Sequence, residues 1–214
     1  MPLNDPNRIL GAILKWAVVV LLCKVTIHIL YNYQGYFPPN FESDFLRGRA
    51  SYFFGSYKFA FYAHILASPI TLVTGTILMS RRFRESYPAR HRMIGKWHVL
   101  IVLALVVPSG LGMATRAYTG AIAGIGFALL SIATGCCAAV GWRQAVLREF
   151  TAHQRWMTRC YLLLCSAIVL RLMAGFFTII QAEPEWTYQF AAWLSWILPL
   201  AGFEAFEKIR ARWT

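Results

Sequence analysis

Long apolar runs separated by short polar segments dominate the chain. They cover about residues 9–31, 58–80, 95–115, 118–142, 156–180 and 186–206. Each run is long enough to cross the hydrocarbon core of a bilayer as a helix, which takes about 20 mostly apolar residues. The pattern predicts an all-α, polytopic membrane bundle of about six transmembrane helices.

The segment between the first two runs has a different character. Residues 32–57 contain nine tyrosines and phenylalanines, and Pro38 and Pro39 forbid a continuous helix there. Aromatic rings favour the membrane–water interface. We therefore divide the chain into an N-terminal transmembrane helix (1–31), an aromatic-rich outer loop (32–57), a four-helix transmembrane core (58–180), and a final transmembrane helix with a basic cytoplasmic tail (181–214).

Composition and charge agree with a membrane location. The chain is 58% hydrophobic and only 14% charged, whereas soluble domains carry about 25% charged residues. Its net charge of +12 comes from cations that gather after the second and fourth runs and in the tail. By the positive-inside rule this places both termini in the cytoplasm of a multi-pass inner-membrane protein. We expect lipid as the surroundings and no nucleic-acid partner.

Motifs of soluble enzymes are missing from the sequence. It has no GxSxG, P-loop, GxGxxG after a strand, or HExxH. The five cysteines fall within apolar runs without CxxC or zinc spacing, which favours small core residues. The sequence therefore does not predict a reaction.

Ionisable residues inside the apolar runs are the best candidates for a site, because a charge there costs at least about 2.5 kcal/mol. The predicted order of membrane crossings places His28, His64 and Arg171 in the outer half of the membrane. It places His91, His98 and His153 at the cytoplasmic ends of the third and fifth helices. Glu204 and Arg159 lie at the same predicted depth, so we expect them to form an ion pair. Arg171 lies at another depth, and we expect it to bind backbone carbonyls or an acidic ligand.

Several of these residues belong to motifs between Tyr62 and Leu172: His64, Pro88-x-x-His91-Arg92-x-x-Gly95-Lys96, His153-x-x-Trp156-Met157-x-Arg159-x-Tyr161, and Arg171. This segment resembles the predicted bacterial membrane proteins designated domain of unknown function 2306. The resemblance implies no activity, but it singles out His64, His91, His153, Arg159 and Arg171. His98 stands where that family often has an aromatic residue.

The layout is also similar in architecture to cytochrome b561 and ferric-reductase membrane haem proteins. One hypothesis is therefore a haem b-binding or quinone-linked electron-transfer protein, because imidazole is a common axial ligand of haem iron. Its cofactor-binding residues would be His64, His98, His153, His91 and Arg171, the last of these holding a propionate. The plain alternative for each histidine is a polar side chain hydrogen-bonded within the bundle.

Other functions stay open. Arg92, Lys96 and Arg159, with His91 and His153, form a basic cluster suited to anionic lipid or another small ligand, although positive-inside topology also requires cations there. His64 and His153 are candidate metal ligands, and His153-x-x-x-Met157 puts two donors on one helix face. A third possibility is an accessory subunit of a larger membrane complex, packing through Gly120-x-x-x-Gly124.

Overall fold

In the computed structural model, residues 6–43 and 45–213 are described, and the chain divides into two compact units, Met1–Tyr52 and Phe53–Thr214. The first unit contains α1 (Pro6–Tyr31), the 3₁₀ helix η1 (Asn32–Gly35) and the short α2 (Ala50–Tyr52). No helix crosses Pro38 and Pro39, as the sequence predicts. The placement of the aromatic segment along the outer surface stays a prediction.

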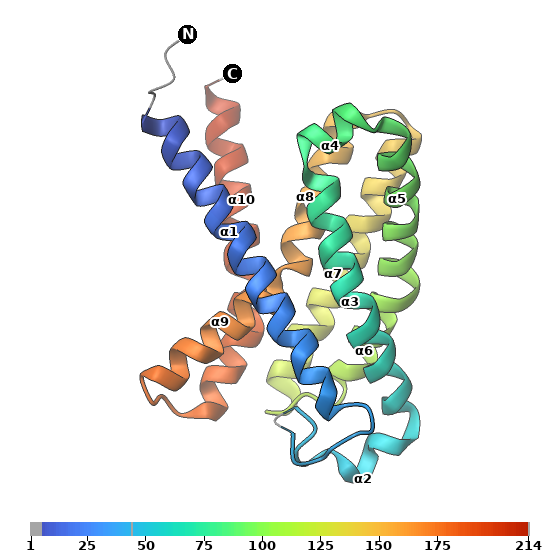
Figure 1. The fold of residues 1–214 in the computed structure, drawn as a ribbon, viewed down its shortest axis with the longest axis vertical. Helices are drawn as coiled ribbons and strands as arrows, with labels where there is room; N and C mark the ends of the chain where they lie inside the picture. Colours follow the sequence, from blue (N-terminus) through green and yellow to red (C-terminus); the bar gives the residue numbers. More distant parts are fainter. Residues whose placement is uncertain (1–5, 44, 214) are drawn as a thin grey trace. The chain divides into compact units, whose positions relative to one another are not determined.

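The second unit is built from helices alone over its described residues (Figure 1). In chain order they are η2 (Phe53–Tyr57), α3 (Lys58–Met79), α4 (Arg81–Ser86), α5 (Pro88–Ile101), η3 (Val102–Val106), α6 (Val107–Ala114), α7 (Ala121–Val146), α8 (Phe150–Leu164), α9 (Ser166–Ile179) and α10 (Pro184–Arg212). The predicted all-α fold is therefore confirmed.

Within the described residues, four helical stretches are long and apolar enough to cross a membrane. They are Ala50–Met79, Pro88–Ala114, Ala121–Val146 and Phe150–Ile179. The chain is thus a multi-pass helical membrane protein. With 29 residues α10 is long enough for a further crossing, but it is less apolar than the other four.

The outward-facing side chains have the character of a lipid-facing surface. On α3 the exposed residues Phe59, Leu66, Ile70, Val73 and Ile77 follow one another at spacings of three, four or seven. Such spacing places them on one helix face. In water this apolar stripe would promote aggregation, whereas in a bilayer it meets acyl chains.

Small residues allow the helices to approach closely, as is usual in membranes. A β-carbon at Gly124 of α7 would lie 2.7 Å from the carbonyl oxygen of Ala114 at the end of α6. Gly120 instead precedes α7 with φ +81°, and a β-carbon there would have no neighbour within 4 Å. Only the second glycine of the predicted Gly-x-x-x-Gly pair therefore makes a close helix contact.

Two helix boundaries differ from the sequence prediction. The basic segment predicted as a loop is helical, forming α4 and the first turn of α5. Pro88 begins α5 at a position where its missing N–H has no intrahelical partner to lose. The predicted fifth helix begins earlier, at Phe150, and is interrupted at Cys165, from which α9 diverges from α8 (Figure 1).

Cations gather at one end of the second unit. α4, the turn between α7 and α8, and the C-terminal part of α10 all lie at that end, whereas the connection between α9 and α10 lies at the other (Figure 1). The end with α4 carries Arg81, Arg82, Arg84, Arg90, Arg92, Lys96, Arg143, Arg148, Arg155, Arg159, Lys208, Arg210 and Arg212. The cytoplasmic location of that end stays a prediction from the positive-inside rule.

Candidate functional site

His64 lies at the contact between α3 and α6. Its Nδ1 is 3.1 Å from the hydroxyl oxygen of Ser109. The Ser109 hydroxyl already donates to the backbone carbonyl of Leu105 at 2.5 Å. It must therefore accept from His64, so the hydrogen-bond network assigns the proton to Nδ1 and the lone pair to Nε2.

Arg171 of α9 belongs to the surroundings of His64. The guanidinium is close enough for its charge to act on the imidazole. It donates a hydrogen bond to the carbonyl oxygen of Ala167 at 2.8 Å and is exposed on its helix. The structure therefore brings together two of the residues predicted for an outer site. His28, the third, lies in the other compact unit.

His98 lies inside the packed core, with 2% of its surface exposed. Its Nδ1 is 2.9 Å from the hydroxyl oxygen of Thr74 on α3, and that hydroxyl donates to the carbonyl of Ile70 at 2.8 Å. The same reasoning as for His64 places the proton on Nδ1. His98 is therefore a hydrogen-bonded core residue, which is the alternative that the sequence left open for each histidine.

A haem does not fit beside His98 in this packing. A β-carbon at Gly75 would lie 2.8 Å from the ring of Tyr161 and 3.4 Å from Cε1 of His98. The Tyr161 hydroxyl is also fixed by Thr76, at 2.7 Å. The two rings fill the space that Gly75 leaves between α3, α5 and α8, so no slot for a macrocycle remains there.

His153 lies in the first turn of α8. Its Nδ1 is 2.8 Å from the carbonyl oxygen of Gly141 on α7. Because a carbonyl only accepts, Nδ1 carries a proton and Nε2 is the nitrogen with a lone pair in the neutral ring. Met157, one turn further along α8, packs with its sulfur toward Gly141 and so fills the interface between these helices.

His91 of α5 lies near His153. The charges of Arg84, His153 and Arg92 all act on its imidazole. Its Nδ1 is buried and has no hydrogen-bond partner within residues 6–43 and 45–213. We call His91, His153, Arg84 and Arg92 the cytoplasmic cluster, after the location that the sequence predicts for this end. None of these four side chains forms an ion pair with a carboxylate in the described structure.

Arg159, in contrast, forms an ion pair with a carboxylate. Its guanidinium donates to both carboxylate oxygens of Glu204 on α10, at 2.5 and 3.0 Å. It also lies over the rings of Trp156 and Phe203. The prediction that Glu204 pairs with Arg159 rather than Arg171 is confirmed, and Arg159 is neutralised instead of being available to an anion.

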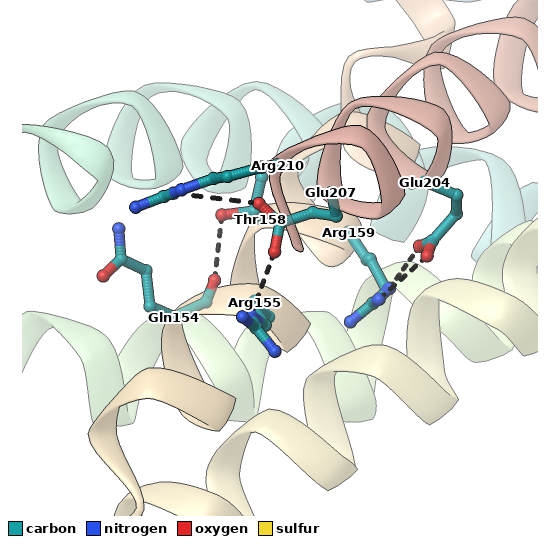
Figure 2. A network of polar contacts seen from close by, with 7 residues as sticks. All are labelled: Gln154, Arg155, Thr158, Arg159, Glu204, Glu207 and Arg210. Atoms are coloured by element: carbon teal, nitrogen blue, oxygen red, sulfur yellow. Dashed lines mark hydrogen bonds and ion pairs between the residues drawn. The ribbon is translucent and has the colours of Figure 1, made fainter. Parts of the chain in front are cut away.

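Figure 2 shows that this pair is one step of a ladder between two antiparallel helices. Arg155, one turn before Arg159, pairs with Glu207 at 2.9 Å, and Glu207 lies 3.9 Å from Arg210. Arg155 and Glu207 were not predicted from the sequence. Their spacing could have identified them, because arginines four residues apart on α8 face glutamates three residues apart on α10.

Lys96 is exposed on α5, with no hydrogen bond or ion pair among the described residues.

His64 and His153, predicted as metal ligands, lie at different helix contacts: His64 forms a hydrogen bond with α6 and His153 with α7. Within the described part of the chain, no three histidine, cysteine, aspartate or glutamate side chains gather as a metal site would require. The residues that fix the histidines, Ser109 and Thr74, were not predicted, since a lone hydroxyl in an apolar run carries no distinctive signal.

Comparison with known proteins gives one match. A protein-family model described as "Predicted membrane protein (DUF2306)" matches residues 61–204. That range runs from Phe61 in α3 to Glu204 in α10 and contains every histidine of the second unit. No curated protein and no solved structure matches the chain.

Proposed function

The chain belongs to the DUF2306 family of predicted membrane proteins, and we propose that it binds an anionic membrane lipid at its cytoplasmic cluster. The supporting observation is electrostatic. Arg84, Arg92, His91 and His153 lie near one another without a carboxylate partner. The two guanidinium groups carry positive charge with no carboxylate beside them, and an anionic phosphate placed next to them supplies the counter-charge.

The position of the cluster favours a lipid headgroup as the anion. Its members come from α4, α5 and α8, at the end of the unit where cations gather (Figure 1). We place this end in the cytoplasm of the inner membrane, with α1 and α10 each adding a crossing to the other four.

The test measures anionic lipid retained by the purified full-length protein. Native mass spectrometry after extraction in mild detergent counts bound phosphatidylglycerol or cardiolipin. We expect the double variant Arg84→Gln/Arg92→Gln to lose the bound lipid. Arg82→Gln/Arg143→Gln removes two cations from the same end outside the cluster and should retain it. Equal retention in both variants would refute the proposal.

A second candidate, haem- or quinone-linked electron transfer, is supported by the way the histidines are held. In His64 and His153 the Nδ1 proton is used in a hydrogen bond, which leaves Nε2 to meet a ligand. Ligating histidines are usually oriented by such an outer partner. His64, with Arg171 nearby, is the better site for a cofactor with an acidic or carbonyl group, since the packing at His98 is closed.

An absorbance scan and a quinone extraction of protein purified from iron-replete cells test this candidate. Haem b gives a Soret band that should decrease in His64→Ala, whereas Cys136→Ala, a change at an exposed position of α7, should leave it intact. Protein with neither a Soret band nor a stoichiometric quinone would rule out electron transfer through these histidines.

A further inference from the structure

A cleft of about 460 Å³ opens at the end of the second unit opposite the ladder of ion pairs. It lies between α9 and the first turns of α10, with Tyr118, which precedes α7, as a further wall. Its volume falls within the range of ligand sites, about 300–1,000 Å³. None of the histidines or arginines discussed above lines it, so it is separate from the proposed lipid site.

The walls of the cleft are apolar in one part and polar in another. Leu170 and Ala174 of α9 and Ala191 of α10 supply aliphatic surface. Gln181 and Glu183, in the connection between the two helices, supply the polar groups. This combination suits an amphiphile whose chain lies against the helices and whose headgroup lies at the connection.

The charge of the polar part indicates which headgroup fits. The Glu183 carboxylate forms no ion pair with any described residue, although the chain as a whole is strongly basic. Glu183 immediately precedes Pro184, the first residue of α10, and proline fixes the backbone there. A second hollow on the other side of Glu183 is lined by Glu185 and Trp186, so negative charge continues beside it.

Aromatic rings complete the electrostatic argument. Tyr118 and Tyr188 line the cleft and meet edge to face, with centroids 5.7 Å apart. Phe177 of α9 lines the same space. Aromatic faces attract cations, and ammonium groups in particular. A carboxylate and three rings around one cleft therefore favour a cationic headgroup over an anionic or neutral one.

The helix α9, which forms one wall of the cleft, also carries exposed apolar side chains. Leu172, Phe176 and Ile179 of α9 are exposed, the last by 81%, and exposed apolar side chains of a membrane helix face lipid. We propose that the cleft between α9 and α10 binds an amphiphile with an alkyl chain and an ammonium headgroup, the chain against Leu170 and Ala174 and the ammonium beside Glu183.

The experiment compares ligands that differ only in the headgroup. Binding of dodecylamine, dodecanol and dodecanoate to the detergent-solubilised full chain is followed by the fluorescence of tryptophan, since Trp186 lines the neighbouring hollow and its ring packs on that of Phe177 in the cleft. We expect dodecylamine to bind at least about tenfold more tightly than the other two, because only it pairs with a carboxylate. Equal affinities for the three would overturn the proposal.

Three variants locate the binding. Glu183→Gln should weaken dodecylamine about tenfold by removing the counter-charge, and Ala174→Phe should abolish binding by filling the cleft. Glu185→Gln, a matched change at an acid that lines only the neighbouring hollow, should have little effect. If Glu183→Gln and Glu185→Gln behave alike, or Ala174→Phe still binds, the cleft is not the site.

A last arm identifies the source of the ammonium group. Phosphatidylethanolamine in nanodiscs and free dodecylamine are tested in competition on the same protein. Displacement of the amine by this lipid assigns a membrane lipid as the ligand, and its absence assigns a free amphiphilic amine; either result supports the proposal. The outcome is independent of the cytoplasmic cluster, because Arg84→Gln/Arg92→Gln leaves every residue of the cleft in place.

Discussion

The pairing of Arg159 with Glu204 provides a quantitative test of how α10 is held on the bundle. The perturbation is a double-mutant cycle with Arg159→Gln, Glu204→Gln and the combination. The side chains are 19% and 40% exposed, so the pair lies between the surface and buried cases. Surface pairs contribute about 0.2–1 kcal/mol, and a bidentate geometry favours the upper end.

These considerations set the expected magnitudes. Solvent around the half-exposed Glu204 screens the attraction, so we expect a coupling free energy of about 1 kcal/mol. Arg159→Gln alone also loses contacts with the rings of Trp156 and Phe203, worth about 0.5–1 kcal/mol. Its total cost is then about 2 kcal/mol, which lowers Tm by roughly 4–8 °C for a chain of this size.

Thermal unfolding in detergent, followed by circular dichroism, measures each corner of the cycle. Arg81→Gln is the control, because Arg81 pairs with Glu85 on one exposed helix and its loss should leave Tm unchanged. A coupling free energy near zero would show that the bidentate geometry does not hold α10. An Arg159→Gln protein as stable as wild type would refute the reasoning altogether.

Three further predictions address the packing and the topology. Gly124→Ala should destabilise the protein by about 1–3 kcal/mol, because the new methyl group meets the fixed carbonyl of Ala114 at 2.7 Å; Gly202→Ala, with open space around it, should not, and equal Tm values for the two would contradict the packing. His153→Ala removes the hydrogen bond from Nδ1 to the Gly141 carbonyl and should cost about 0.5–1.5 kcal/mol in the same melts, whereas His153→Asn, which keeps a donor, should recover part of this. A reporter fused after Thr214 should be active only as a cytoplasmic reporter, and periplasmic activity would contradict the assigned orientation.

Much of the helical architecture follows from the apolar pattern because the bilayer sets a minimum length for each crossing. The depth of a residue follows as well, since each residue of a helix adds about 1.5 Å. That rule alone matched Glu204 with Arg159 and excluded Arg171, and the two hydrogen bonds confirm it. Composition alone does not determine the number of crossings, because α10 mixes aromatic and polar residues with aliphatic ones.

Other features depend on packing that a single sequence does not encode visibly. The segment with α4 looked like a loop because it is strongly basic, yet arginine is a good helix former. The interruption at Cys165 has no proline or glycine to announce it. Arg84 comes within electrostatic range of His91 because α4 packs beside α5, and neither periodicity nor charge predicts that geometry.

The cations at the end with α4 separate into two groups that topology alone does not distinguish. The positive-inside rule explains why both groups are on that side, but it does not specify their partners. Arg155 and Arg159 face the acids of α10, so their charge serves the fold. Arg84 and Arg92 lie beside His91 without such acids. Because Glu204 and Glu207 pair with Arg155 and Arg159, the surroundings of Arg84 and Arg92 remain electropositive. This difference between the two groups favours an anion from the membrane as the partner of Arg84 and Arg92.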